Sequence, residues 1–570
     1  MFICYFYYTK NLIKILKKKG FDPMQKKRMA HIGILCFIFS LALCACGSQN
    51  SQPETQTPEL STVLDSNQET EEMEEMNELN KQEIDYEALF KDLKLTKNYK
   101  EIYNTNPLMS QRFGADPYAM VYEDRVYFYM TADAFEYDAA GNIVENTYGK
   151  ISSINVISTT DMMNFTDHGS IQVASSSGAA TWARNSWAPA AAWKEIDGKP
   201  KFFLYFADNG GGIGVLTADS PIGPFTDPLG KGLITRETPN CSNVLWLFDP
   251  AVLVDDDGKA YLYFGGGVPE GKVSDPGTAR VVQLGDDMIS IVGEPVRIDV
   301  PYLFEDSGIH KAGDKYYYTY CSNWQVDEAG TEKYGFHNAE IVSMESDSPM
   351  GPFTVKETIL ENPGKYFGLY GNNHHCVFNF QGNWYITYHT RVLEQAMGVE
   401  HGYRSTHVDS FTMQEDGTIG TIRQTKTGRE QLSYVDPYQV NRAANIATMG
   451  GIECVPADAQ SGQYGVGNMA VGSIDTGDFI LVKGVDFGDK SPTKMSVWAK
   501  NPEGNTGVIQ VRIDKPFGDV LGYLPVGGAA SEFTEFSADL TQQVTGVHDL
   551  YFIFYGEGYE IDTWQFNNAN

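Results

Sequence analysis

Five short aromatic segments with alternating apolar residues repeat along this chain, and such a repeat is compatible with few folds. Each segment follows a turn of Asp, Gly or Asn, and the five begin at Val126, Phe202, Tyr261, Tyr316 and Trp384. A self-similar β unit of roughly 40 to 70 residues is typical of a propeller, in which each unit forms one antiparallel blade around a central axis. The sequence therefore predicts an all-β, five-bladed β-propeller.

Titratable residues precede four of these segments by about ten residues. They are Asp116, Asp249, Glu305 and His374, and each stands in a short polar break just before an apolar run. Equivalent positions near the start of each blade's inner strand would all face the central axis. Three carboxylic acids and one histidine that are far apart in the chain are therefore expected to converge on one site, as catalysis requires.

A second repeat supports the blades and locates a domain boundary. The segment Ala218–Asp227 returns as Ser346–Val355, and the pattern stops near Ser433. Beyond Pro437 a different series of short strands begins. We therefore predict a propeller over residues 96–434 and a β-sandwich (jelly-roll) module over residues 435–570.

The N-terminal residues read as a secretion signal. Basic residues at Lys26–Arg28 precede an apolar run, Ile32–Leu43, which is too short to span a bilayer comfortably. The sequence Leu43–Gly47 resembles a bacterial lipobox, which implies acylation at Cys46 and tethering to the outer face of a membrane. An ordinary cleaved signal or an uncleaved anchor is the alternative. We assign residues 1–46 to the signal, with a start at Met24 as a variant.

An acidic, polar segment follows the signal. Residues 47–95 are rich in Glu, Gln, Asn, Ser and Thr over most of their length, so they are expected to form a disordered linker. The net charge of −31 argues against nucleic acid and anionic lipid as partners and suits a neutral ligand. The cysteines after residue 46 are widely spaced and predict neither a disulfide scaffold nor a zinc site. We expect an extracellular, cell-surface monomer whose contact with the membrane is the lipid anchor alone.

Five motifs in order resemble glycoside hydrolase family 43. They are Gly114–Tyr118, Ser186–Pro189, Trp246–Val252, Phe304–Lys311 and Gly371–His375. The resemblance is greatest to the members that remove single α-L-arabinofuranosyl branches from xylan. It implies an inverting, exo-acting hydrolase of arabinoxylan or arabinoxylo-oligosaccharides that needs no cofactor for its chemistry. A β-xylosidase, an arabinan-debranching enzyme and, in another class, a non-catalytic glycan-binding surface lipoprotein are the alternatives.

The resemblance assigns roles to three carboxylic acids. Asp116 is expected to be the general base, Glu305 the general acid, and Asp249 the residue that orients Glu305 and raises its pKa. Inverting hydrolysis needs one ionised and one protonated carboxyl group, roughly 6.5 to 9.5 Å apart. A nearby anion disfavours ionisation of Glu305 and so keeps it protonated. Asp306, beside Glu305, is interpreted as a surface or turn carboxylate.

Other site residues follow from the same resemblance. His374 lies where the family has an axial calcium or a water-filled channel. A structural Ca²⁺ there would be held mainly through waters, and a purely structural histidine is the alternative. Trp246 is expected to form a platform for xylose, with ordinary core packing as the alternative. Arg404 is expected to contact arabinose hydroxyls or to be a solvated or salt-bridged residue, and Asn373 to contact substrate. In place of a glycine run, Leu369 and Tyr370 stand near the cleft and could change which branch is accepted.

The C-terminal residues resemble carbohydrate-binding module family 6. The resemblance rests on Thr476–Phe479, Gly546–Tyr551 and Asp562–Phe566. Arg442–Asn445 replaces a Glu-Ala-Glu sequence and removes two carboxylates expected to hold a calcium ion. Candidate sugar-binding residues are Tyr464, Phe533 and Asn567, and both a binding and a mainly structural module are compatible with the sequence.

Overall fold

The computed structural model describes residues 84–457 and 467–567. This part of the chain is almost entirely β structure, which confirms the all-β prediction. Within it, no helix is long and apolar enough to cross a membrane. Cys46, the signal and most of the predicted linker lie outside the described residues, as does Tyr464.

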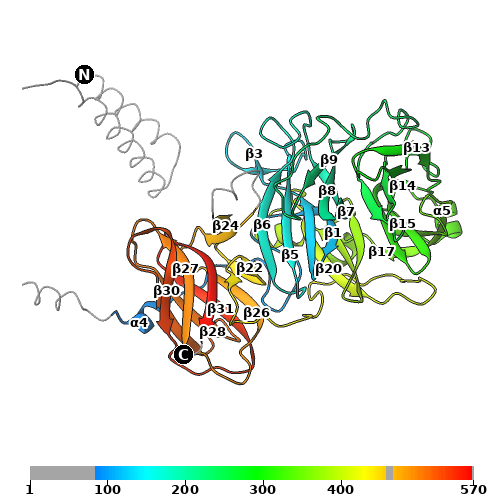
Figure 1. Ribbon diagram of the computed structural model, residues 1–570. Coiled ribbons are helices and arrows are strands. Elements are labelled where there is room, and N and C mark those ends of the chain that lie inside the picture. The colour runs from blue at the N-terminus through cyan, green and yellow to red at the C-terminus, as the bar shows by residue number, and fades with distance from the viewer. Residues whose placement is uncertain (1–83, 458–466, 568–570) are drawn as a thin grey trace, which may run out of the picture. The chain divides into compact units, whose positions relative to one another are not determined.

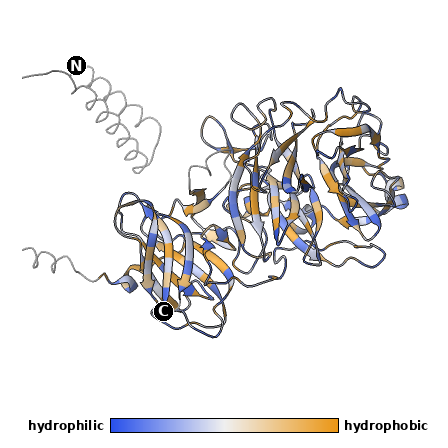
Figure 2. Cartoon of the chain, in the orientation of Figure 1, coloured by the Kyte–Doolittle hydropathy of each residue, from blue (hydrophilic) through white to orange (hydrophobic). Residues whose placement is uncertain are grey.

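Five antiparallel sheets follow one another along residues 115–411 (Figure 1). In chain order they consist of β1 (Ala115–Tyr122), β2 (Arg125–Thr131), β5 (Ser153–Thr159) and β6 (Phe165–Gln172); β7 (Trp187–Ile196), β8 (Lys199–Ala207) and β9 (Ile213–Ala218); β10 (Ala251–Val254), β11 (Ala260–Phe264), β12 (Arg280–Leu284) and β13 (Ile291–Arg297); β14 (Leu303–Ala312), β15 (Lys315–Ser322), β16 (Ile341–Ser346) and β17 (Thr354–Leu360); β18 (His375–Phe380), β19 (Asn383–Thr390) and β20 (Ser405–Phe411). Each repeated aromatic segment is the second strand of its sheet. Apolar residues are concentrated in the strands (Figure 2).

Short elements connect these strands. They are the strands β3 (Glu136–Tyr137) and β4 (Ile143–Val144) and the helices α5 (Glu328–Tyr334), α6 (Gly364–Phe367) and α7 (Val392–Met397). Helix α5 begins at Asp327, whose side chain accepts a hydrogen bond from the Gly330 amide, and ends at Gly335 in the left-handed conformation.

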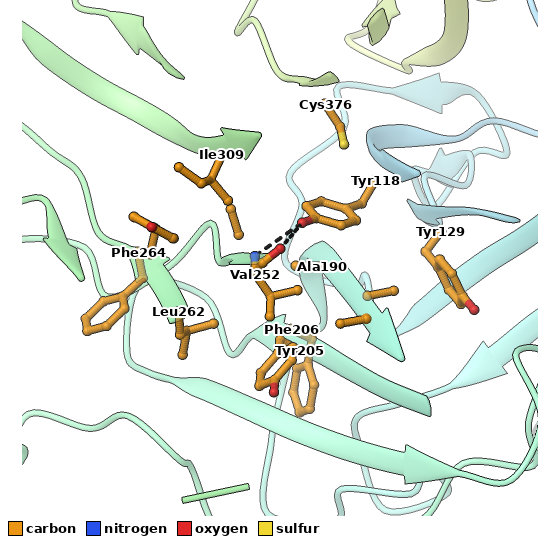
Figure 3. Packing of buried hydrophobic residues seen from close by; sticks show 14 of the residues in the cluster. Tyr118, Tyr129, Ala190, Tyr205, Phe206, Val252, Leu262, Phe264, Ile309 and Cys376 are labelled. Carbon is orange, nitrogen blue, oxygen red and sulfur yellow. Dashed lines mark hydrogen bonds between the residues drawn. The ribbon is translucent and has the colours of Figure 1, made fainter. Parts of the chain in front are cut away.

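The first strands of the five sheets contact one another in sequence. Strand β1 contacts β7, β7 contacts β10, β10 contacts β14, β14 contacts β18, and β18 contacts β1. Figure 3 shows one residue of each first strand near the Tyr118 ring, namely Tyr118 itself, Ala190, Val252, Ile309 and Cys376. The Tyr118 hydroxyl donates to the Val252 carbonyl at 2.8 Å, and the Val252 amide donates to the hydroxyl at 3.2 Å. Tyr118, Val252, Ile309 and Cys376 form a buried layer two to four residues beyond the predicted site residues Asp116, Asp249, Glu305 and His374.

The same backbone distortion occurs near the start of four first strands. Asp116, Ala188, Asp249 and Asp306 have φ of 46°, 39°, 49° and 68°. Non-glycine residues in the left-handed region cost of order 1–3 kcal/mol and cluster at functional sites. Asp306, rather than Glu305, therefore occupies the position equivalent to Asp116 and Asp249. Glu305 precedes it, between two shifts in the pairing of β14 with β15.

Two further sheets make up the C-terminal module. One contains β21 (Asn441–Arg442), β24 (Glu453–Pro456), β25 (Met469–Gly472), β27 (Lys494–Asn501), β30 (Ala530–Asp539) and β32 (Glu560–Asn567); the other contains β23 (Thr448–Gly450), β26 (Phe479–Asp486), β28 (Val508–Ile513), β29 (Val520–Pro525) and β31 (Val547–Tyr555). Residues of both sheets share one buried apolar cluster, including Val482, Val497, Phe552 and Trp564. Strand β22 (Asn445–Ile446) instead pairs with β6 and extends the first sheet.

The N-terminal end of the described chain packs on this module. Helix α4 (Tyr86–Phe90) places Phe90 in a buried cluster with Phe479 and Tyr551. The Thr96 amide donates to the Gly477 carbonyl at 2.8 Å. The prediction that the disordered linker extends to residue 95 is therefore wrong for residues 86–95, because their apolar side chains cover an outer sheet face.

Candidate active site

A cavity of about 300 Å³ brings the predicted acids together. Asp116, Asp249, Glu305 and His374 all line it, although they come from four different sheets or the loops before them. The other lining residues are Tyr148, Trp187, Ala188, Phe248, Phe304, Trp324, Asn372 and Arg404. Half of the wall is therefore aromatic or apolar, with carboxyl groups and cations at its centre, as is common in ligand sites.

Asp116 is held as an anion. The Arg404 guanidinium donates through Nη1 to its Oδ1 at 2.8 Å, and the Asp116 amide donates to His389 Nδ1 at 3.0 Å. Burial acts to raise the pKa of Asp116, but Arg404 and then His389 outweigh it and hold that pKa well below its usual range. Asp116 can therefore accept a proton but carries none near neutral pH.

Arg404 is a buried, salt-bridged residue. Its Nε and Nη2 donate to the two carboxylate oxygens of Asp133 at 2.9 and 2.8 Å. This bidentate salt bridge fixes the plane of the guanidinium group. The Tyr148 ring centroid lies 4.8 Å from the guanidinium carbon. Of the two expectations for Arg404, the salt bridge is the one that the structure shows. Asp133 was not predicted from the sequence. The feature that could have identified it is its place as an acidic residue just after a buried aromatic strand.

Glu305 is held in its neutral form. Burial first, and then the neighbouring Asp249, raise the pKa of Glu305 well above its usual range. Its Oε1 is buried and has no hydrogen-bond partner within the described chain. The pKa of Asp249 is also raised, by burial, while His374 acts against the rise. Because burial and the neighbouring Asp249 disfavour ionisation of Glu305, Glu305 keeps a proton that it can donate.

Substituting Asp249 by asparagine should move the pH profile. The Asp249 charge helps to raise the pKa of Glu305, so a neutral amide in its place lowers that pKa, and Glu305 loses its proton at a lower pH. We expect the alkaline limb of kcat/KM to shift toward lower pH in D249N. The measurement is kcat/KM from pH 4 to 10, and an unchanged alkaline limb would contradict the coupling.

His374 and His375 both contact Asp306. His374 Nδ1 lies 2.9 Å from Asp306 Oδ1, and His375 Nδ1 lies 2.5 Å from Asp306 Oδ2. The prediction that Asp306 is a surface or turn carboxylate is wrong, because its side chain is fully buried. Burial acts to raise the pKa of Asp306, but the two histidines outweigh it and lower that pKa to about 2. The His374 ring, whose pKa is raised, supplies positive charge beside this buried carboxylate.

The arrangement around His374 does not fit direct ligation of calcium. Its Nε2 lies 3.7 Å from Asp249 Oδ2, so carboxylates face both ring nitrogens. Burial acts to lower the pKa of His374, but Asp306 and the other acids raise it to about 10. A doubly protonated ring has no lone pair for a metal. Among the described residues, no group of three or more His, Cys, Asp or Glu side chains is arranged to hold a metal ion.

The predicted substrate contacts are only partly at the cavity. Trp246 does not line the cavity, and its ring is partly exposed, with its centroid 5.3 Å from that of Phe248 and 5.4 Å from that of Phe304. Asn373 is fully buried and donates to the Ala339 carbonyl at 3.1 Å, so its amide nitrogen is occupied by the protein. Trp324, which was not predicted from the sequence, lines the cavity and is 39% exposed.

Phe533 and Asn567, the two candidate residues of the C-terminal module that the structure describes, lie on one outer sheet face. Asn567 pairs with Lys494 at one end of β27, and Lys500 Nζ lies 5.0 Å from the Phe533 ring centroid near the other end. Six residues of strand, about 20 Å, separate these ends. Trp498 lies between them and is 42% exposed. This tryptophan was not predicted from the sequence, although its alternation with buried Val497 and Ala499 places it outside the core.

An ionised acid and a protonated acid that face one cavity are the pair that an inverting glycoside hydrolase uses. Residues 104–419 match the family described as glycosyl hydrolases family 43, and residues 442–568 match carbohydrate binding module family 6. The chain belongs to glycosyl hydrolase family 43, and its second module is a family 6 module.

Curated relatives and a solved structure agree with this assignment. The chain is 48% identical to an arabinoxylan arabinofuranohydrolase of Paenibacillus polymyxa over 81% of this chain and 74% of that protein. It is 46% identical to an arabinoxylan arabinofuranohydrolase of Bacillus subtilis over 82% of this chain and 93% of the relative. The crystal structure of a family 43 arabinoxylan arabinofuranohydrolase from Bacillus subtilis, in complex with cellotetraose, matches with a TM-score of 0.79 and 44% identity, over 83% of this chain and 99% of that chain.

Proposed function

We propose that this enzyme removes α-L-arabinofuranosyl side groups from arabinoxylan or arabinoxylo-oligosaccharides with inversion of configuration. The observation that carries the proposal is the pairing of ionised Asp116 with protonated Glu305 in one cavity. The names of the two relatives that match most of this chain supply the substrate class.

The proposed reaction is a single displacement. Asp116 takes a proton from a water molecule while that water's oxygen forms a bond to the anomeric carbon of the arabinosyl unit. The bond from that carbon to the xylan oxygen breaks, and Glu305 gives its proton to this oxygen. Asp249 keeps Glu305 protonated, and the Arg404 guanidinium holds the Asp116 carboxylate at 2.8 Å. No cofactor takes part.

The aromatic wall next to Glu305 suits the xylan main chain. Phe304 and Trp324 line the cavity together with Glu305, and Trp324 is partly exposed. A sugar ring attached to the oxygen that Glu305 protonates would lie against these faces. Trp246 packs against Phe304 and is partly exposed, so it stays a proposed platform for xylose beside this wall.

Sugar release tests the proposal against its alternatives. Cereal arabinoxylan, linear xylo-oligosaccharides and debranched arabinan are incubated with the enzyme, and the products are separated by chromatography. Arabinose from arabinoxylan alone is expected. Xylose from the linear oligosaccharides would establish a β-xylosidase, and arabinose chiefly from arabinan an arabinan-debranching enzyme. A protein that binds glycan without releasing sugar would establish the non-catalytic alternative.

The fold assignment belongs to the same proposal. The five sheets are the blades of a closed propeller over residues 96–434, and residues 435–570 form a jelly-roll sandwich. The contacts among the five first strands and the apolar cluster shared by the last two sheets support this arrangement. A crystal structure of the enzyme would test it.

The second module is proposed to bind xylan through the outer face that carries Trp498. An exposed tryptophan in the middle of a sheet offers a flat apolar surface for a sugar ring. We expect W498A to lower binding to insoluble xylan about tenfold, since burying a large side chain contributes about 1.5 kcal/mol or more. Pull-down with W193A, which removes an exposed tryptophan of β7, is the control. Equal binding of wild type and W498A would assign the module a structural role.

Three further proposals come from the sequence. Cys46 is lipidated and tethers a monomer to the outside of a bacterial cell; labelling with a radioactive fatty acid should succeed for wild type and fail for C46S. The monomeric state is checked by light scattering.

A structural calcium ion near His374 would bind through water molecules, since the ring does not fit direct ligation. A Tm that falls on treatment with EDTA and recovers when calcium is added would support this proposal.

A further inference from the structure

A second cavity adjoins the catalytic one. Its volume is about 190 Å³, and it shares Tyr148, Asn372 and Arg404 with the catalytic cavity as a common wall. Leu369 and Tyr370, the residues that replace a glycine run, also line it. The reaction proposed above does not use this space.

The second cavity lies on the side of the general base. Two of its lining residues, His389 and Arg404, are the residues that contact Asp116, at 3.0 Å from its amide and 2.8 Å from its carboxylate. His389 Nε2 lies 2.9 Å from the Asn372 carbonyl oxygen, so the ring spans from Asp116 to the shared wall. Glu305 and Trp324 line the catalytic cavity but not this one.

Its chemistry suits water. The back wall contains the buried polar residues Thr390 and Arg404, and the rim carries the exposed Glu145 and Tyr370, which is 57% exposed. A cavity needs roughly 10–15 Å³ and two to four polar partners for each water, so this one has room and partners for several. It therefore has room for water on the other side of the His389 and Arg404 side chains that contact Asp116.

A separate source of water would suit an exo-acting inverting hydrolase. The polysaccharide that carries the arabinosyl branch covers the catalytic cavity on the Glu305 side, where the leaving oxygen lies. The attacking water must approach the opposite face of the sugar, beside the base. We propose that the second cavity supplies this water to Asp116 past the Tyr148–Asn372 wall. The inference rests on the proposed function, in which Asp116 deprotonates the water.

Filling the cavity tests the inference. Gly371 lines the cavity, and within 4 Å a Cβ added there would meet only Arg391 Cδ, at 3.6 Å, so a larger side chain can start at this position without a clash. We expect G371L to lower kcat about tenfold on both arabinoxylan and 4-nitrophenyl α-L-arabinofuranoside, with KM unchanged. L369W narrows the same cavity from another residue and should act in the same direction. G527L, where an added Cβ meets nothing within 4 Å, is the matched control and should resemble wild type.

Each other outcome has a definite meaning. Wild-type kcat in a folded G371L and L369W would overturn the inference. A raised KM confined to doubly substituted oligosaccharides, with normal turnover of the aryl substrate, would also overturn it and make the cavity a sugar subsite. Wild-type enzyme without activity on either substrate would instead refute the proposed function, so the two failures are distinguishable. Melting temperatures of all variants identify any that do not fold.

Discussion

Replacing Glu305 by alanine is expected to lower kcat/KM on arabinoxylan by about 10³-fold. A positioned general acid contributes typically 10²–10⁴-fold, and the xylan oxygen is a poor leaving group without a proton. 4-Nitrophenolate leaves without protonation, so E305A should lose far less activity on 4-nitrophenyl α-L-arabinofuranoside. The measurement is kcat/KM of E305A on both substrates.

Comparing the loss of kcat/KM on the two substrates distinguishes loss of the general acid from damage to the fold. E415A removes an exposed glutamate outside the cavity and serves as the matched control, with activity close to wild type on both. Equal losses on both substrates for E305A would argue that Glu305 has another role. Unchanged activity on arabinoxylan would remove it from the mechanism.

Replacing Asp116 by asparagine is expected to lower kcat about 10³-fold on both substrates alike. Deprotonation of water is required whatever the leaving group, and a neutral amide of the same shape cannot accept the proton. The acid and base variants should thus differ in their dependence on the leaving group. Measuring kcat of D116N on both substrates makes this comparison.

A control is needed because Arg404 bonds to Asp116. The variant leaves the guanidinium with Asp133 as its remaining carboxylate partner, so its Tm should be compared with that of wild type. A folded D116N that keeps activity on the aryl substrate while losing it on arabinoxylan would contradict its assignment as the base, since that pattern belongs to the acid.

The sequence predicted most of the architecture because its signal is local and repeated. An alternating aromatic strand after a tight turn needs no distant partner to be recognised, and all five such segments are second strands of sheets. The predicted linker extends too far toward the C-terminus. Its apolar residues, such as Phe90, are few, and they pack against strands more than 380 residues away in the chain.

The residues of the site also differ in whether they have a local signal in the sequence or depend on distant partners. Asp116, Asp249 and Glu305 could be found because each precedes a repeated strand. Asp133 and Asp306 could not be read correctly, because their importance comes from partners, Arg404 and two histidines, that are distant in sequence. Trp324 was missed because its exposure depends on how neighbouring elements pack, whereas the exposure of Trp498 could have been inferred from the alternation of its strand.

The central claim is that Asp116 and Glu305 act on opposite faces of one arabinosyl unit, and the anomer first released tests it most directly. Arabinoxylan is hydrolysed in an NMR tube, and proton spectra are collected before the sugar mutarotates. The mechanism predicts β-L-arabinofuranose as the first product, from α-linked branches. Initial release of the α-anomer would show retention and contradict the assignment of Asp116 as a base.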